Sequence, residues 1–202
     1  MSLISLIIAL LLEQWRPLAD RKVLVSRAVR FADFLQQHFN AGERAHGMIA
    51  WALGVVPAML LAIVAYYLLY RLSPLLALAF NVLILYVTMG FRHVGHYFTD
   101  IHWALKSGDL DQARAILGQW RGASCERLNA EEVARLTIEE ALVASYQHVF
   151  AVVFWFVLLP GPIGAILYRM SSFLHRRWAD GGDAELAAFG SFAAQVFRLL
   201  DW

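Results

Sequence analysis

Two histidines and an aspartate near the middle of the chain have the spacing of metal ligands. His93, His96 and Asp100 occupy positions i, i+3 and i+7 of the segment RHVGHYFTDIHWALKSG, and side chains at this spacing share one face of a helix. Imidazole and carboxylate groups bind transition metals. The same polar face also suits a helix that leaves a lipid bilayer, and no HExxH-type motif accompanies these histidines. We therefore expect no bound metal, and these three residues are the weak candidates for one.

Glu139 is the carboxylate best placed for acid or base chemistry. It lies just before residues 141–168, which contain no Asp, Glu, Lys or Arg, and a carboxylate beside a membrane-embedded cavity tends to be functional. The alternative is that Glu139 ends an exposed helix stabilised by ion pairs, and the sequence leaves both readings open. The sequence has no Gly-rich phosphate loop, GxSxG elbow or Cys/His zinc set. We expect no cofactor.

The composition predicts an all-α integral membrane protein. Hydrophobic residues make up 60% of the 202-residue chain, and the mean hydropathy is +0.55, well above the apolar content of soluble domains. The formal net charge of +1 gives no sign of a nucleic-acid partner. Cys125 is the single cysteine, so no intramolecular disulfide can form.

Two stretches have the character of transmembrane helices. Residues 48–70 form an apolar run of 23 residues, which as a helix reaches roughly 35 Å against a hydrocarbon thickness of about 30 Å. A second span is predicted over residues 75–91 after a turn at Pro74, which gives a transmembrane hairpin. Residues 3–12 are too short to span, and no cleavage pattern of a signal peptide follows them.

The third apolar block, residues 141–168, is interrupted by the segment LPGPIG at 159–164. Pro160 and Pro162 lack backbone donors, and glycine loosens the chain. We favour a re-entrant hairpin over a single crossing, because a hairpin returns Arg176 and Arg177 to the side where the other basic segments lie. The positive-inside rule places the N-terminus and residues 92–140 in the cytoplasm.

The cytoplasmic parts are predicted to be amphipathic helices. Residues 23–39 suggest a helix along the membrane surface, the second span is predicted to continue without a break to Gly108, and Asp109 caps a helix over 110–120. Asn129 and Glu132 resemble a capping box. The predicted order within one membrane domain is a short apolar N-terminus with an interfacial helix (1–44), the hairpin (45–91), cytoplasmic helices (92–140), the broken block (141–168) and a C-terminal segment (169–202).

This order of parts resembles a family of bacterial membrane proteins. The resemblance lies in GFR at 90–92, KSGDLDQAR at 106–114, NAEEVAR at 129–135 before Glu139, and VFAVVFWFVLLPGPIGAILYRMSSFL at 149–174. The family includes the cobalamin-biosynthesis CobD/CbiB proteins and the AmpE proteins linked to β-lactamase induction. In the biosynthetic members it implies an adenosylcobinamide-phosphate synthase, which joins an aminopropanol or its phosphate to a carboxylate of adenosylcobyric acid. Members continue past the region of residues 199–202, so we expect a fragment or a shortened member.

The resemblance carries site residues only in part. It implies four catalytic candidates, Arg92, Asp109, Glu139 and Arg169. The arginines would hold anions, and Glu139 would accept a proton or anchor an amine. It also implies four binding candidates, Gly161, Pro162, Gly164 and Tyr168. From the residues alone, the glycines and proline are better explained by a tight turn. This sequence also departs from the family's polar motifs at three places, where it has Ala123, Ser124 and Cys125; Val143, Ala144 and Gln147; and Ser171, Ser172 and His175.

Three functional hypotheses follow. Because the departures remove polar groups, the first is a non-catalytic, AmpE-like regulatory or accessory protein of the inner membrane that acts through contacts on its cytoplasmic face. The second is the amide-forming synthase, with a corrinoid as its substrate. The third is a structural subunit of a membrane complex. The expected partners are the lipid bilayer and other membrane proteins.

Overall fold

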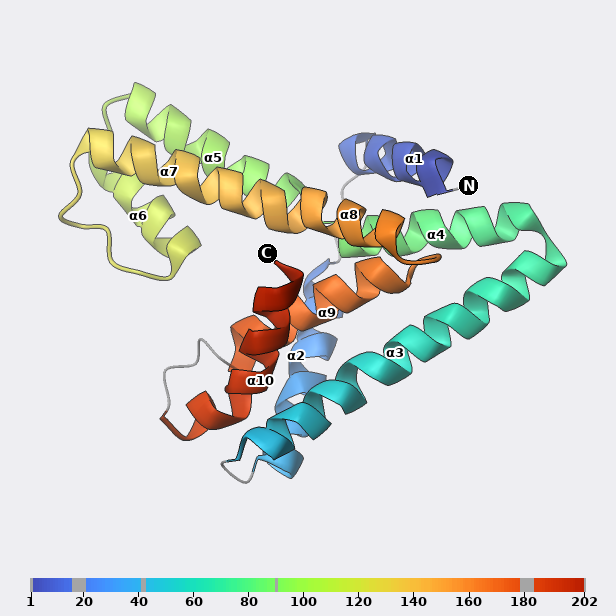
Figure 1. Cartoon of the computed structure of the whole chain (residues 1–202). Coiled ribbons are helices and arrows are strands. Elements are labelled where there is room, and N and C mark those ends of the chain that lie inside the picture. The colour runs from blue at the N-terminus through green and yellow to red at the C-terminus, as the bar shows by residue number, and fades with distance from the viewer. Residues whose placement is uncertain (1, 16–20, 41–42, 90, 179–183, 202) are drawn as a thin grey trace. The chain divides into compact units, whose positions relative to one another are not determined.

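Every regular element that the structure describes is helical. The computed structural model describes residues 2–15, 21–40, 43–89, 91–178 and 184–201, with side chains for all of these except 2, 21–25, 91–94 and 184–187. No strand occurs within these ranges (Figure 1). The helices are α1 (Ser2–Trp15), α2 (Arg21–Phe39), α3 (Arg44–Leu72), α4 (Pro74–Thr88), α5 (Phe91–Lys106), α6 (Leu110–Arg121), α7 (Ala130–Ser145), a π-helical turn (Tyr146–Phe150), α8 (Ala151–Leu158), α9 (Ile163–Trp178) and α10 (Ala184–Leu200). The predicted all-α class is confirmed.

The chain divides into two compact units. Unit 1 consists of Met1–Thr88 and Ala151–Trp202, and unit 2 is Met89–Phe150. Unit 1 therefore contains α1 to α4 and α8 to α10, whereas unit 2 contains α5, α6, α7 and the π-helical turn.

The core of unit 1 lies where α2, α3, α9 and α10 pack together. Its centre is formed by Leu35, Val55, Leu174, Trp178 and Phe189, all of which are buried. Two contacts fix the relative direction of α3 and α9. Gly54 in the first half of α3 lies beside Leu174 in the later part of α9, since a Cβ on Gly54 would be 3.4 Å from that side chain. Tyr66 near the end of α3 lies beside Gly161 just before α9, since a Cβ on Gly161 would be 3.5 Å from the Tyr66 ring. The two helices therefore run antiparallel.

The helices α8 and α9 form a hairpin around the predicted break. Gly161 has φ +68°, in the left-handed region that favours glycine. Past the turn, Gly164 packs directly on the backbone of α8, because a Cβ there would lie 1.8 Å from the carbonyl oxygen of Trp155. The turn between residues 158 and 163 is therefore as predicted, whereas its position in a membrane stays a prediction.

Two helical stretches are long and apolar enough to cross a membrane by length and composition. They are Arg44–Leu72, which is α3, and Ala130–Leu158. The helix α4 has 15 residues, and at about 1.5 Å per residue it rises roughly 22 Å, less than a hydrocarbon core of about 30 Å. The predicted second span of 75–91 is thus replaced by a shorter apolar helix.

The prediction of one unbroken helix from the second span to Gly108 is wrong. The helix α4 ends at Thr88 and α5 begins at Phe91. At the end of α4 the Thr88 hydroxyl donates to the carbonyl oxygens of Ile84 and Leu85, at 2.8 and 3.2 Å. The sequence has Gly90 between the two helices, and glycine is the residue that weakens a helix interior most after proline.

Unit 2 packs α5, α6 and α7 around a small core. Ile101, Leu117 and Val133 are fully buried at its centre. The predicted caps are confirmed: Asp109 accepts a hydrogen bond from the amide of Gln112, and Asn129 and Glu132 form a capping box. These caps fix where α6 and α7 begin, and they place the loop between them.

Candidate functional site

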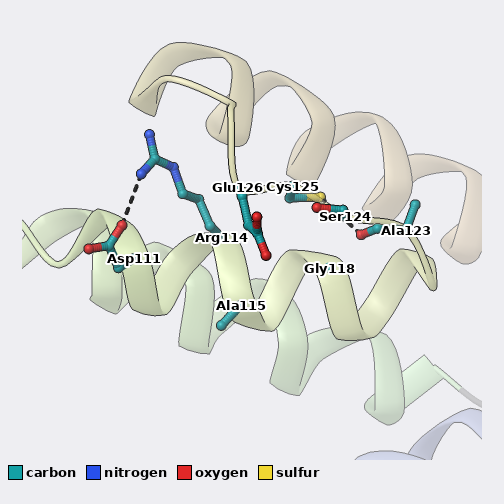
Figure 2. Close-up of a pocket in the computed structure, with 8 residues that line it drawn as sticks. All are labelled: Asp111, Arg114, Ala115, Gly118, Ala123, Ser124, Cys125 and Glu126. Carbon is teal, nitrogen blue, oxygen red and sulfur yellow. Dashed lines mark hydrogen bonds and ion pairs between the residues drawn. The ribbon is translucent and has the colours of Figure 1, made fainter.

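A cavity in unit 2 lies between α6 and the loop that follows it. It has a volume of about 490 Å³. Figure 2 shows Arg114 rising from α6 toward the loop and Glu126 reaching from the loop toward α6. The remaining lining residues come from the same two segments: Asp111, Ala115, Gly118, Ala123, Ser124 and Cys125. The loop contains Ala123, Ser124 and Cys125, one of the three places where the sequence departs from the polar motifs that the resemblance implies.

Arg114 is held from two directions at the wall of this cavity. Its Nε donates to the carbonyl oxygen of Leu128 at 2.7 Å, and its Nη1 donates to Asp111 Oδ1 at 2.9 Å. The hydrogen bond to Leu128 ties the end of the loop to α6. The arginine therefore stabilises the loop and at the same time lines the cavity.

The structure separates two of the predicted catalytic carboxylates. Asp109 lies at the start of α6, whereas Glu140, next to Glu139, lies 3.7 Å from Arg121 at the end of that helix. Since α6 has 12 residues, its two ends, and with them Asp109 and the Glu139–Glu140 pair, lie roughly 18 Å apart. Asp109 has a structural role as the cap of α6. Glu139 is exposed and lies 3.8 Å from Arg135. This ion pair fits the alternative prediction, in which Glu139 belongs to an exposed helix stabilised by ion pairs.

Two further predicted residues lie next to each other on α9 in unit 1. Tyr168 is fully buried, and its hydroxyl donates to Asp201 Oδ1 at 2.6 Å. Arg169 follows it and is partly buried. The side chain of Arg92 lies outside the described residues. The four catalytic candidates are thus distributed over the two units, and their roles stay predictions.

The three predicted binding residues of the turn have packing roles in unit 1. Gly161 supplies the left-handed conformation beside Tyr66, and Pro162 is buried. Gly164 allows α9 to approach the backbone at Trp155. These observations agree with the tight-turn interpretation from the residues alone.

The predicted metal candidates lie on α5. His96 and Asp100 are exposed, and the side chain of His93 lies outside the described residues. Within the described part of the chain, no group of three or more His, Cys, Asp or Glu side chains could hold a metal ion.

Three features of the structure were not predicted. The first is the Tyr168–Asp201 hydrogen bond, which joins residues 33 positions apart. The second is the π-helical turn over Tyr146–Phe150, a distortion that often marks functional sites. The third is the buried hydroxyl of Ser171, which has no hydrogen-bond partner in the described structure. Only the third had a signal, since Ser171 follows Tyr168 at helical spacing.

Fold and composition first define a class: all-helical proteins with stretches apolar enough to span a membrane. The family model described as CobD/Cbib protein matches residues 6–202, and the chain belongs to this family. No solved structure gives a significant match.

Two relatives share about a third of their aligned residues with this chain. "Cobalamin biosynthesis protein CobD" of Stutzerimonas stutzeri (strain A1501) is 35% identical over 177 residues, which is 86% of this chain and 56% of the relative. The protein of the same name from Chromobacterium violaceum is 35% identical over 159 residues, or 79% and 49% of the two chains. The chain therefore spans about half the length of these relatives.

These findings overturn the first functional hypothesis. The non-catalytic, AmpE-like regulator was inferred from lost polar residues, but the matching relatives are named for cobalamin biosynthesis. Membership of the AmpE branch, in contrast to the family as a whole, is not shown. The error came from treating substitutions at three motifs as loss of function, when a family can keep its pathway while those positions change.

Proposed function

We propose that the protein represented by this chain forms an amide bond in cobalamin biosynthesis, between an aminopropanol or its phosphate and a carboxylate of adenosylcobyric acid. The observation that carries the proposal is the family match over residues 6–202, supported by relatives named for this pathway. Because the chain spans about half of those relatives, the activity is proposed for the whole protein.

The chemistry sets requirements for the site. A carboxylate oxygen is a poor leaving group, so the carboxyl group is first activated by an energy-rich phosphate donor. The amine nitrogen then loses a proton and attacks the carboxyl carbon, and the oxygen leaves as phosphate. A proton acceptor and a binder of anions are both needed. We assign the first role to Glu139 and the second to Arg92 and Arg169. Asp109 contributes by capping α6, through its 3.0 Å bond from the Gln112 amide.

The proposal includes a location in the bacterial inner membrane. On α3, Leu61, Val64 and Leu68 are 74%, 62% and 63% exposed. Exposing such side chains to water costs about 25 cal/mol per Å², whereas lipid chains accommodate them. The apolar stretch of α3 is bounded by Arg44 at its start and Arg71 at its end, as expected for a helix whose charged ends lie at the two membrane surfaces.

The direction of α9 supports a hairpin that returns to its starting side. The turn at Gly161 just before α9 lies near Tyr66, and Leu174 in the later part of α9 lies near Gly54. The basic end of α9, with Arg176 and Arg177, therefore points toward the end of α3 that begins at Arg44. By the positive-inside rule this side is cytoplasmic. We propose that the N-terminus and residues 92–140 lie in the cytoplasm as well.

A complementation experiment tests the proposed activity. The full-length protein is expressed in a bacterium that lacks its own CobD/Cbib family gene and needs cobalamin synthesis for growth. Restored growth supports the proposal, and accumulation of adenosylcobyric acid without growth contradicts it. Glu139→Gln and Arg169→Gln should abolish growth, whereas the exposed control variants Glu131→Gln and Arg127→Gln should not.

A further inference from the structure

We propose that the outward face of α2 binds anionic phospholipids of the cytoplasmic membrane leaflet, with Arg27 and Arg30 on the phosphate and Phe31 and Phe34 against the acyl chains. The inference rests on the inner-membrane location proposed above and not on the amide-forming activity. It names the class of lipid that this face recognises, which a membrane location leaves open.

The inward side of α2 is fixed to unit 1 by packing and by an ion pair. Ala32 and Leu35 are buried in the core that α2 shares with α3, α9 and α10. Next to them, Asp33 Oδ1 lies 2.8 Å from both Nε and Nη2 of Arg177 on α9. These contacts set the rotation of α2 about its axis, so they determine which of its side chains point outward.

The outward side of α2 combines basic and aromatic side chains, and we call it the basic-aromatic face. Arg27, Arg30, Phe31, Phe34 and His38 are all exposed, and their spacing of i, i+3, i+4, i+7 and i+11 places them on one side of a helix. Phe31 and Phe34 are 45% and 52% exposed. The ring of His38 lies against that of Phe34, with centroids 4.1 Å apart. Exposed phenylalanine beside arginine is typical of a helix in the headgroup region of a bilayer.

The charge of the basic-aromatic face is positive and is not cancelled within the described residues. The one acidic residue of α2 is Asp33, and Arg177 compensates its charge. None of the ion pairs among the described residues includes Arg27 or Arg30. Arg30 uses Nε for the carbonyl oxygen of Ser26, at 3.4 Å, which leaves the terminal nitrogens of its guanidinium for a phosphate.

These side chains fit an anionic lipid better than a soluble anion. A phosphate would accept charge-assisted hydrogen bonds from the two arginines, and the acyl chains attached to it would cover the phenylalanine rings. A free phosphate would leave those rings in water. In the proposed topology, Arg177 belongs to the cytoplasmic end of α9 and contacts α2 directly, so the basic-aromatic face lies beside the leaflet whose anionic lipids attract basic side chains.

Native mass spectrometry of the full-length protein in detergent tests the proposal, through the ratio of lipid-bound to lipid-free protein at increasing lipid concentration. The probes are phosphatidylglycerol, which is anionic, and phosphatidylcholine with the same acyl chains, which is zwitterionic. We expect phosphatidylglycerol to bind about tenfold or more tightly, because each arginine near an anionic headgroup contributes roughly a fivefold factor. Two competitors stand for the other sources of negative charge: glycerophosphoglycerol for a free phosphate and polyglutamate for an acidic protein. Neither should displace the lipid.

Variants assign the binding to α2. The double variant Arg27→Gln/Arg30→Gln should lower the preference for phosphatidylglycerol about tenfold or more, whereas Arg27→Lys/Arg30→Lys keeps the charge and should retain most of it. The matched control Arg127→Gln/Arg135→Gln removes two exposed arginines of unit 2 and should leave the preference unchanged. Phe34→Gln should weaken the binding of both lipids and leave their ratio unchanged, because it removes acyl-chain contact and no charge.

Three results would overturn the proposal: equal affinity for the two lipids, displacement of the lipid by either competitor, or a preference that Arg27→Gln/Arg30→Gln leaves intact. Retention of the protein in membranes washed with alkaline carbonate tests the membrane location by itself, and none of the probes contains a corrinoid. Failure of the lipid inference is therefore distinguishable from failure of the location and of the amide-forming activity.

Discussion

Replacement of Gly164 by alanine should destabilise unit 1 strongly, although the change adds a single methyl group. The new Cβ would lie 1.8 Å from the Trp155 carbonyl oxygen and 2.4 Å from the carbonyl carbon. That oxygen already accepts a hydrogen bond from the Leu159 amide, at 3.1 Å. It therefore cannot move without loss of the hydrogen bond that ends α8. Because the obstacle is backbone, the whole α8–α9 hairpin must separate.

The expected magnitude follows from the cost of overpacking. Inserting a methyl group into a packed contact costs about 1–3 kcal/mol, and a backbone clash belongs at the upper end, at roughly 3 kcal/mol. For a chain of this size that corresponds to a melting temperature lower by about 6–12 °C. The assay is thermal unfolding of the protein in detergent, followed by far-UV circular dichroism and tryptophan fluorescence.

Two control variants separate the clash from the general effect of replacing glycine. Gly54→Ala lies in the same unit, and its new Cβ would meet only side-chain atoms, the nearest two being methyl groups at 3.3 and 3.4 Å, so we expect a change within about 1 kcal/mol. Gly95→Ala lies in open space on α5 and should gain about 0.5–1 kcal/mol of helix stability. A melting temperature of Gly164→Ala within about 1 °C of the unmodified protein would be far below the predicted shift. That result would refute the close approach of α9 to the backbone of α8.

Three further outcomes are expected. Tyr168→Phe removes the 2.6 Å bond to Asp201 and should cost about 1–2 kcal/mol in thermal unfolding, whereas Tyr67→Phe, at an exposed ring, should cost nothing measurable; equal effects would refute the role of the bond. Asn129→Ala breaks the capping box and should cost about 1 kcal/mol, seen as faster hydrogen exchange at the start of α7, and unchanged exchange would contradict this. A cysteine at Arg176 should react with membrane-impermeant reagents only from the cytoplasmic side, and labelling from outside would disprove the hairpin topology.

Local features of the fold could be predicted because they depend on neighbouring residues. The turn at Pro74, the cap at Asp109 and the capping box at Asn129 all appear as expected. The helix predicted over residues 48–70 is present within Arg44–Leu72, because a long apolar run without charges has few alternatives.

The break between α4 and α5 was missed because the apolar pattern continues across it. Gly90 was the available signal, but an isolated glycine inside a helical pattern is often tolerated. The π-helical turn at Tyr146–Phe150 has no signal in single-residue propensities. Features of this kind depend on packing between elements distant in the sequence.

The candidate site was harder to predict than the fold for the same reason. Sequence reasoning selected charged residues beside apolar runs, and the structure gives Asp109 a cap and Glu139 an ion pair with Arg135. The cavity beside Arg114 was missed, because it arises where the loop of residues 122–128 folds back on α6. No spacing rule relates those positions.

The most direct test of the proposed amide-forming role is product analysis by mass spectrometry. The purified full-length protein is incubated with adenosylcobyric acid, aminopropanol phosphate and an energy-rich phosphate donor. We predict a corrinoid whose mass has increased by that of the amine less one water, and its loss in the Glu139→Gln variant. Unchanged adenosylcobyric acid under conditions in which a CobD relative converts it would contradict the proposal.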